Sequence, residues 1–279
     1  PAMSDGSGLN EFAKKYPSRF YDVGIAEQHA LTFAAGLSLS GHKPVVAIYS
    51  TFLQRAYDQL IHDIAIQNIP MLFAIDRAGI VGADGATHSG NFDISFIRCI
   101  PNLVLMAPSN EADCYQMLNL GFNHNGICAV RYPRGESKNQ YLNKETEPIR
   151  FGSAKKIRTG KSIAILAFGT IVNTCLEVAE DINATVVDMR FVKPIDKKMI
   201  KEICLHHNFI VTVEENVVSG GAGSAVLEAL SEMQLSCKTL VIGIPDKFFE
   251  HGSQKEVLKI CGLDKNTIKR KIVKQHKEC

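Results

Sequence analysis

Three polar residues with acid–base or hydrogen-bonding capacity, Glu27, Gln28 and His29, stand directly before an apolar stretch. The apolar residues that follow recur at the spacing of one helical face, which predicts a helix that begins at Glu27. A carboxylate in the first turn has a structural explanation, because unpaired backbone amides there favour a negative charge. It can also be held at the helix mouth to exchange a proton with a ligand. The residues leave both interpretations open, and the frequency of acidic residues in first turns favours the structural one.

Further reactive side chains follow the apolar runs that predict β-strands. They are Tyr49, Phe52 and Arg55 around the end of the run at 43–50, Arg77 after the run at 69–76, Asp84 and His88 in the glycine-rich loop that follows, and Arg134 after the run at 127–133. The carboxyl ends of parallel strands meet at one sheet edge, so we expect these residues to converge there. Each has a structural explanation by itself, since glycines make turns and exposed arginines form weak ion pairs. Their convergence favours a ligand site.

Other polar residues are assigned to the framework. The tetrapeptide "GADG" at 82–85 lacks the lysine of a P-loop and the spacing of a dinucleotide-binding loop. His206, His207 and the pair Glu214 and Glu215 are predicted to be surface residues or structural residues of the second half of the chain, because no other reactive residue is expected beside them.

The elements that must position the reactive residues alternate along the chain. In the first half, strands are predicted over 19–25, 43–50, 69–76, 103–109 and 127–133, with helices from Glu27 and over 51–67 and 110–122. In the second half, strands over 162–169, 184–190, 209–216 and 238–244 alternate with helices around 171–181, 196–207 and 222–233. Apolar strands separated by helices are typical of parallel sheets covered on both faces. We therefore predict an α/β protein with two tandem three-layer domains and mainly parallel sheets.

A polar and charged segment at 136–160 separates the two halves and resembles a linker. We place a first domain over 1–140, the linker over 141–155 and a second domain over 156–279. At 279 residues, the chain is long enough for two domains of ordinary size.

Composition excludes several classes of function. With 31 basic and 29 acidic residues the net charge is +2, which gives no electrostatic case for binding nucleic acid or an anionic membrane. The eight cysteines contain no CxxC pair and no zinc-ligand spacing with histidine, which favours reduced thiols in a cytoplasm. The longest apolar runs are far shorter than the roughly 18 residues of a membrane span.

The longest stretch of recognisable motifs runs from "DVGIAEQHALTFAAGL" through "YSTFLQRAYDQ" to "DRAGIVGADGATHSG". These motifs closely resemble those of the 1-deoxy-D-xylulose-5-phosphate synthases, a family of transketolase-like thiamine diphosphate enzymes. "VRYPRG", "VKPID" and "VEENVVSGGAGSAV" continue the resemblance, which covers nearly the whole chain. The family has a diphosphate-binding domain, a pyrimidine-binding domain and a C-terminal domain, and this chain resembles the last two. The resemblance assigns the first predicted domain to pyrimidine binding and the second to the transketolase C-terminal domain.

The resemblance also implies roles for the reactive residues. The glutamate matching Glu27 hydrogen-bonds a ring nitrogen of the cofactor's aminopyrimidine and so promotes the proton transfer that makes the thiazolium carbon nucleophilic. Phe52 matches the residue that stacks on the pyrimidine, and Arg55 lies beside it. The residues expected to line the substrate pocket are Tyr49, Arg55, Asp84 and His88, of which His88 helps to move protons. Arg77 and Arg134 match a clamp for the phosphate of glyceraldehyde 3-phosphate, to which the guanidinium fork is well suited.

The implied reaction is a transferase reaction of pyruvate with D-glyceraldehyde 3-phosphate, which releases carbon dioxide and gives 1-deoxy-D-xylulose 5-phosphate. Its product feeds isoprenoid, thiamine and pyridoxal synthesis. The family's magnesium and diphosphate site lies in the diphosphate-binding domain, which the resemblance does not place in this chain. We therefore expect no metal ligands in this chain and no activity from it alone. The resemblance further implies a homodimer in a bacterial cytoplasm.

Two alternatives stay open. The beta subunit of a thiamine diphosphate-dependent 2-oxo acid dehydrogenase consists of the same two domains and pairs with a separate alpha subunit. The "DRAGIVGADGATHSG" loop and the clamp arginines match the synthase better. The other alternative is a non-catalytic module of the same fold, against which the retained site residues argue.

Overall fold

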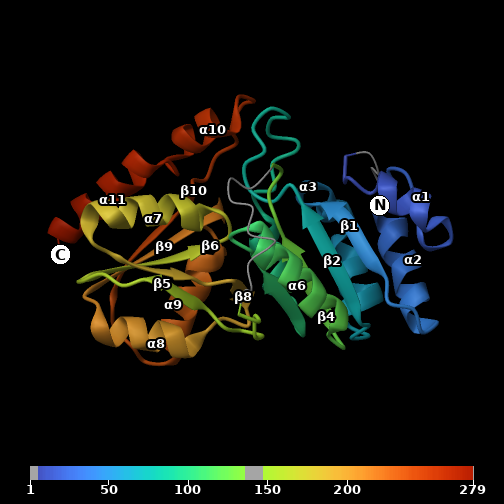
Figure 1. Cartoon of the computed structure of the whole chain (residues 1–279), viewed down its shortest axis with the longest axis horizontal. Coiled ribbons are helices and arrows are strands. Elements are labelled where there is room, and N and C mark those ends of the chain that lie inside the picture. The colour runs from blue at the N-terminus through green and yellow to red at the C-terminus, as the bar shows by residue number, and fades with distance from the viewer. Residues whose placement is uncertain (1–5, 136–146, 279) are drawn as a thin grey trace.

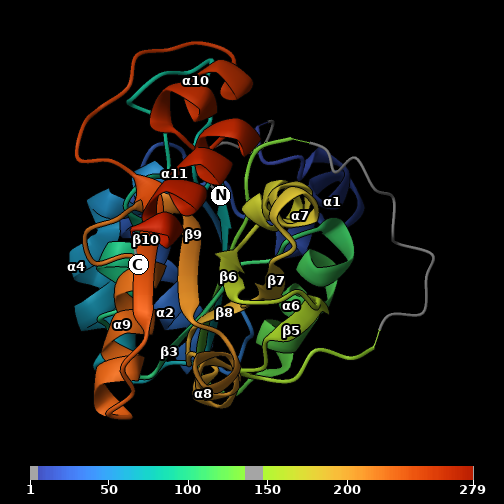
Figure 2. The same cartoon turned by 90° about the vertical axis from the view of Figure 1, so that its left-hand side faces the viewer.

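The computed structural model describes residues 6–135 and 147–278 of the chain. Residues 141–146 of the predicted linker therefore lie outside the described residues. Two five-stranded, mainly parallel sheets lie side by side, each with helices on both faces (Figures 1 and 2). The predicted α/β class with two tandem three-layer units is confirmed.

The first sheet has the strand order β1-β2-β4-β3-β8. Its strands are β1 (Val45–Tyr49), β2 (Met71–Asp76), β4 (Ile127–Arg131), β3 (Leu103–Met106) and β8 (Phe191–Lys193). The first four are parallel, and their register sets Tyr49 beside Asp76 and Ile75 beside Arg131. The polar residues that end these strands therefore share one edge of the sheet, as the sequence predicts.

The second sheet has the order β10-β9-β6-β7-β5. Its strands are β10 (Lys238–Ile244), β9 (Phe209–Val217), β6 (Ile163–Phe168), β7 (Thr185–Asp188) and β5 (Lys155–Arg158), of which only β5 is antiparallel to its neighbour. β8 follows β7 in the chain but pairs antiparallel with β3 of the first sheet. The chain therefore crosses from the second sheet to the first at β8 as well as at the linker. The domain boundaries predicted from the sequence stay a prediction.

The helical segments of the first half are α1 (Asn10–Lys15), η1 (Pro17–Arg19), α2 (Glu27–Leu39), α3 (Ser50–Leu53), η2 (Gln54–Ala56), α4 (Tyr57–Gln59), η3 (Leu60–Ala65), α5 (Asp93–Ile97) and α6 (Glu111–Asn123). Those of the second half are α7 (Ile171–Ile182), α8 (Lys197–His206), α9 (Ala222–Glu232), α10 (Gln254–Cys261) and α11 (Lys265–Lys277). Side-chain caps begin several of them; Ser253 and Glu256, for example, form a reciprocal capping box at α10.

Two local expectations are wrong. Residues 20–25 form no strand, because the side chain of Asp22 accepts the amide of Gly24 and Gly24 takes a left-handed φ of 65°, which turns the chain. The helix expected over 51–67 is broken into α3, η2, α4 and η3, of which η3 is a π-helix. Such insertions into a helical stretch are frequent at functional sites, and this one begins at Leu60, after the short segment α4 that follows Arg55.

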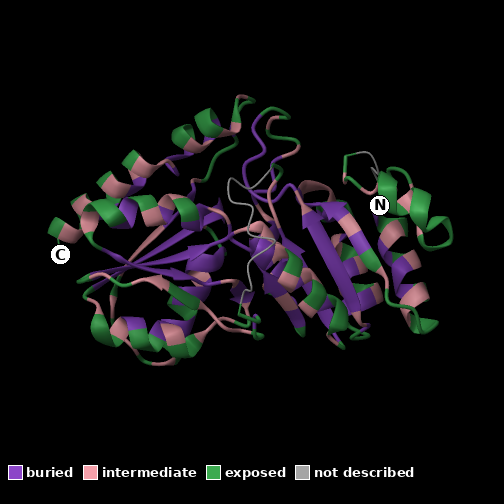
Figure 3. Ribbon diagram, in the orientation of Figure 1, coloured by how far each residue is buried: buried purple, intermediate pink, exposed green. Residues whose placement is uncertain are grey.

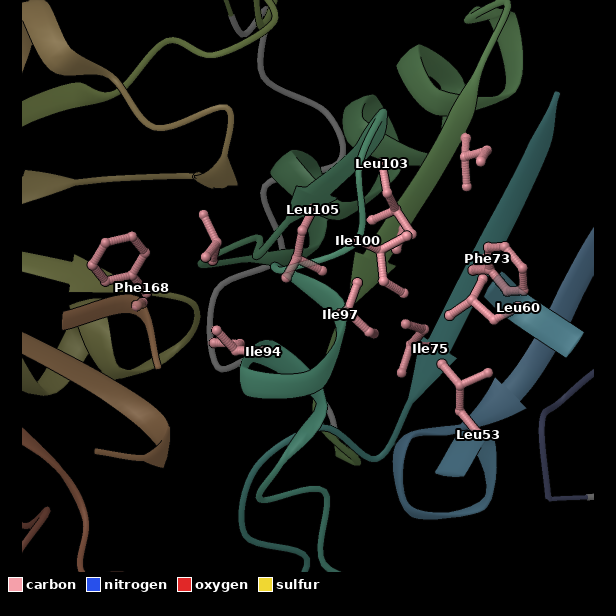
Figure 4. Close-up of a cluster of buried hydrophobic side chains, with 14 of the residues drawn as sticks. Leu53, Leu60, Phe73, Ile75, Ile94, Ile97, Ile100, Leu103, Leu105 and Phe168 are labelled. Atoms are coloured by element: carbon pink, nitrogen blue, oxygen red, sulfur yellow. The ribbon is translucent and has the colours of Figure 1, made fainter. Parts of the chain in front are cut away.

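The strands form the buried centre of each unit, and the helices turn their exposed faces outward (Figure 3). One core cluster extends through both units. Figure 4 shows it running from Leu53 and Phe73 through Ile97 and Leu105 to Phe168, which belongs to β6 of the second sheet. The burial of apolar side chains is therefore continuous from one unit to the other.

No helix within residues 6–135 and 147–278 combines the length and apolar character that crossing a bilayer requires.

Candidate active site

Glu27 begins α2 and is 2% exposed, whereas the neighbouring Gln28 and His29 are exposed. No donor in the described part of the chain lies within hydrogen-bonding distance of its carboxylate. The nearest cationic group is the Arg55 guanidinium, whose Nη1 lies 3.6 Å from Glu27 Oε2. Buried carboxylates are normally hydrogen-bonded, so this one is suited to accept a hydrogen bond from a ligand. The helix N-terminus additionally favours its negative charge.

Aromatic rings connect Glu27 to the rest of the predicted site. Arg55 lies over Phe52, with its guanidinium carbon 5.7 Å from the ring centroid. Phe52 stacks on Tyr49 with 5.6 Å between centroids and meets His88 edge to face at 5.4 Å. Because Phe52 remains only half-buried, a flat heterocycle can contact its ring.

Arg77 follows β2 and takes a left-handed φ of 56°, which is unusual for a residue with a side chain. Its Nη1 donates to Asp76 Oδ2 at 2.5 Å, and its guanidinium carbon lies 3.7 Å from the Tyr49 ring centroid. Nη1 and Nη2 both donate to the carbonyl oxygen of Gly6 at 3.2 Å. Burial raises the pKa of Asp76, and the Arg77 charge opposes that rise. Arg77 is therefore a fixed, largely buried cation.

Asp84 and Arg134 form a partly exposed ion pair in which Arg134 Nη1 lies 2.6 Å from Asp84 Oδ2. Burial raises the pKa of the Tyr49 hydroxyl, and the charges of Arg77, Asp76, Arg134 and Asp84 all act on it. Thr87 Oγ1 donates to the carbonyl oxygen of Asp84 at 3.5 Å, so the Arg134–Asp84 pair and His88 belong to the same turn of the loop. His88 is oriented by a 2.9 Å hydrogen bond between its Nδ1 and Thr87 Oγ1.

The structure thus brings the eight predicted residues into one neighbourhood: Glu27, Arg55, Phe52, His88, Tyr49, Arg77, Asp84 and Arg134. Asp76 and Thr87 belong beside them. Asp76 could have been found from its place at the end of a strand, directly before Arg77. No group of three or more metal-ligating side chains occurs among the described residues.

The residues that the sequence analysis assigned to the framework differ in location and in contacts. Glu214 and Glu215 are buried, so a surface location is wrong for both. Glu214 caps α9 by accepting the amides of Ala222 at 2.6 Å and Gly223 at 2.8 Å, which is a structural role. Its neighbour Glu215 lies instead against the loop of Asp84 and His88. His207 bonds Thr185 Oγ1 at 2.7 Å, and His206 is exposed.

The family model of the transketolase pyrimidine-binding domain matches residues 1–140, and that of the transketolase C-terminal domain matches residues 152–268. The chain belongs to the transketolase family. Among curated proteins it is similar to 1-deoxy-D-xylulose-5-phosphate synthases. The one from Histophilus somni is 60% identical over 92% of this chain, that from Pasteurella multocida 58% over 98%, and that from Nitrosomonas europaea 55% over 95%. The chain spans only 42–44% of the length of these relatives.

Solved structures of transketolases share the fold. One described as a split-gene transketolase, inactive beta4 tetramer, has a TM-score of 0.86 and 29% identity, covering 98% of this chain and 89% of that one. The transketolase from Campylobacter jejuni has a TM-score of 0.70 at 20% identity, covering 91% of this chain and 39% of that one. The second likeness concerns the fold alone.

Proposed function

We propose that this chain forms the pyrimidine-binding and substrate-binding part of a 1-deoxy-D-xylulose-5-phosphate synthase. The enzyme would join pyruvate to D-glyceraldehyde 3-phosphate, with release of one carbon dioxide and formation of 1-deoxy-D-xylulose 5-phosphate. The observation that carries the proposal is the buried Glu27 carboxylate, which no donor of the described residues satisfies, beside the half-buried ring of Phe52. Curated relatives that are 55–60% identical to the chain are named 1-deoxy-D-xylulose-5-phosphate synthases.

Glu27 would accept a hydrogen bond from a ring nitrogen of the aminopyrimidine of thiamine diphosphate. The Arg55 guanidinium lies 3.6 Å from the carboxylate, and Phe52 would support the ring by stacking. When bound, the cofactor supplies a nucleophilic thiazolium carbon and an electron sink for decarboxylation. The protein's own contribution is to position these groups and to hold charge near them.

His88 and Asp84 would contact the carbonyl and hydroxyl oxygens of the substrates, with His88 moving a proton as the aldehyde adds. Arg77 and Arg134 would bind the phosphate. Arg134 is the more available of the two, because only its Nη1 is engaged by a described residue and its side chain is half exposed. Arg77 would approach the phosphate with a guanidinium already fixed by Asp76 and Gly6, which limits the entropy lost on binding.

The diphosphate and its magnesium would be held by a diphosphate-binding domain outside this sequence, and the complete protein would be a homodimer. The expected cytoplasmic location also stays a prediction. The 279-residue chain by itself should then bind thiamine diphosphate weakly and without dependence on magnesium. Tight, magnesium-dependent binding by this chain, measured by calorimetry, would contradict this part of the proposal.

The activity is tested with the chain joined to a diphosphate-binding domain, by carbon dioxide release from pyruvate with and without glyceraldehyde 3-phosphate. Release should rise on addition of the aldehyde phosphate. Glu27→Gln should lower the rate by about 10²- to 10⁴-fold, the usual worth of a positioned acid–base group. Gln28→Ala, at the exposed neighbouring position, is the matched control and should leave the rate within about twofold. A Glu27→Gln variant with the unchanged rate would refute the role of Glu27.

A split arrangement is a second candidate, because the split-gene transketolase structure covers the same extent of chain. In that case a separate polypeptide would carry the diphosphate-binding domain, as in the 2-oxo acid dehydrogenases. The acceptor decides between the chemistries. A requirement for glyceraldehyde 3-phosphate supports the synthase, whereas transfer to a lipoyl group supports a dehydrogenase subunit. Absence of both with the diphosphate-binding domain present supports a non-catalytic module.

A further inference from the structure

The loop that carries Asp84 and His88, residues 78–90, is called here the site loop. It is closed at its base by a pair of backbone hydrogen bonds, in which Gly79 and Gly90 each donate to the other at 2.8 Å. The residues near this base are buried, and the tip around Asp84 is exposed. Figures 1 and 2 both place the site loop, drawn in teal after β2, beside α10 of the second half. The position of the tip therefore depends on what holds the base.

Glu215, at the end of β9 in the second sheet, directs its carboxylate at this base. Thr170 Oγ1 donates to Oε1 of this carboxylate at 3.4 Å, and Oε2 is buried without a hydrogen-bond partner among the described residues. A Cβ added at Gly79 would lie 2.8 Å from Glu215 Oε2, so the carboxylate packs directly against the glycine backbone. Glu215 therefore contacts the base of the site loop at Gly79.

Residues before and within α10 hold the next part of the site loop. Gln254 Nε2 donates to the carbonyl oxygen of Ile80 at 2.8 Å, and the amide of Gly252 donates to that of Gly82 at 3.3 Å. A Cβ at Gly82 would lie 2.5 Å from the backbone nitrogen of Gln254. The start of the loop is thus confined between β9 and the segment that leads into α10.

The far end of the site loop is held by the same strand. The amide of Val217 donates to the carbonyl oxygen of Asn91 at 2.9 Å, and Asn216 Oδ1 accepts the amide of Ile94 at 3.2 Å. Arg131 binds Asp93 through Nε at 2.7 Å and also donates from Nη2 to the Glu215 carbonyl oxygen at 3.1 Å. The carboxyl end of β9 therefore contacts the chain on both sides of the loop.

We propose that Glu215 is a positioning residue, which reaches from the second unit to fix the base of the site loop and so sets where Asp84 and His88 stand. Burying a carboxylate is costly, and an apolar side chain would fill the same space at lower cost. Burial indeed raises the pKa of Glu215, while the Arg131 charge opposes the rise. The hydrogen bond from Thr170 to Oε1 leaves Oε2 packed against Gly79, and an apolar residue would lack this directed contact. The link to catalysis rests on the proposed function, whereas the bracing of the loop concerns this chain alone.

Glu214 provides a matched comparison, because it is the adjacent residue, is also buried, and binds the amides of α9 instead of the site loop. Amide hydrogen exchange, followed by mass spectrometry, is compared in the parent chain, Glu215→Ala and Glu214→Ala. In Glu215→Ala, exchange in residues 78–90 should be about tenfold faster or more, because removal of the packed side chain leaves a cavity beside Gly79. In Glu214→Ala, the increase should appear at residues 222–226 and leave the site loop within about twofold of the parent.

Equal loosening of the site loop in both variants, or none in Glu215→Ala, would overturn the proposal. If Glu215→Ala does not fold, Thr170→Val replaces it, since Thr170 donates to Glu215 through its hydroxyl. Exchange at Gly79 and Ile80 should then rise about threefold or more. Unchanged exchange in that variant would equally overturn the proposal. Glu215→Gln keeps the side-chain volume against Gly79 and an acceptor for Thr170 Oγ1, so its exchange should be closer to that of the parent than the exchange of Glu215→Ala.

Kinetics of the chain joined to its diphosphate-binding domain separate this inference from the proposed function. A loosened loop together with a KM for glyceraldehyde 3-phosphate raised about tenfold, and a smaller change in kcat, supports both. Faster exchange in the site loop with unchanged kinetics supports the positioning role of Glu215 and refutes the roles proposed for Asp84 and His88. A raised KM without faster exchange in the site loop overturns the positioning role of Glu215.

Discussion

The ion pair between Arg131 and Asp93 lies where the two units meet, and removal of Arg131 should be among the most destabilising single changes. Asp93 is 0% exposed and Arg131 is 4% exposed. The pair is bidentate, with Nε 2.7 Å from Oδ2 and Nη2 3.1 Å from Oδ1. Arg131→Met keeps most of the side-chain volume but leaves a buried carboxylate without a counter-charge. Such a loss costs about 3 to 5 kcal/mol of the free energy of unfolding.

Equilibrium unfolding of the 279-residue chain in urea, followed by circular dichroism, measures this cost. With a typical dependence on urea for a chain of this size, the midpoint should fall by about 1 to 2 M. Lys197→Met is the control, because Lys197 and Glu232 form an ion pair of 2.6 Å with side chains that are 46% and 67% exposed. That pair should be worth no more than about 1 kcal/mol.

A double variant tests the physical reason for the cost. Arg131→Met combined with Asp93→Leu removes both charges, so it should be more stable than Arg131→Met alone. The reasoning is refuted if Arg131→Met costs less than about 1 kcal/mol, or if the double variant is no more stable than the single one. Either result would mean that Asp93 finds another partner or solvent when Arg131 is lost.

Two further predictions concern the seam and the loop. Burial raises the pKa of Asp188 to about 7 from 3.8, with Asp113 adding to the rise, so the folded chain holds this proton more tightly than the unfolded chain. The contribution of Asp188 to the free energy of unfolding is therefore complete below about pH 4 and is lost as the pH rises to 7, by at most about 1.4 kcal/mol per pH unit. Asp188→Asn should remove this slope in urea unfolding between pH 5 and 7, and identical slopes in parent and variant would contradict the assignment. Gly82 and Gly24 both have a positive φ, of 88° and 65°, but only a Cβ added at Gly82 would meet another part of the backbone. Gly82→Ala should therefore be less stable than Gly24→Ala by about 1 kcal/mol or more in thermal unfolding. Equal losses of stability would show that the close approach of Gly82 to Gln254 is unimportant.

Much of the fold was predictable because its signals are local. The apolar runs at β1, β2 and β4 and the periodicity from Glu27 predicted the elements, and the parallel arrangement predicted that their polar ends would share one edge. The strand expected over 19–25 failed because Asp22 and Gly24 favour a turn over an extended chain. The breaks after Phe52 carried no local signal, since Tyr57 through Ala65 keep a helical pattern in the sequence.

The sequence by itself determined the residue types of the candidate site, the order of strands and helices that delivers them, and the resemblance to a family. Only the tertiary structure decided that β8 would join the first sheet, that Glu215 would lie against Gly79, and that Gln254 would bond Ile80. Gln254 and Ile80 are 174 positions apart in the chain. Periodicity reports which face of one element is buried, whereas contacts between distant elements depend on how whole sheets pack, and that information is spread over many residues rather than written in any one motif.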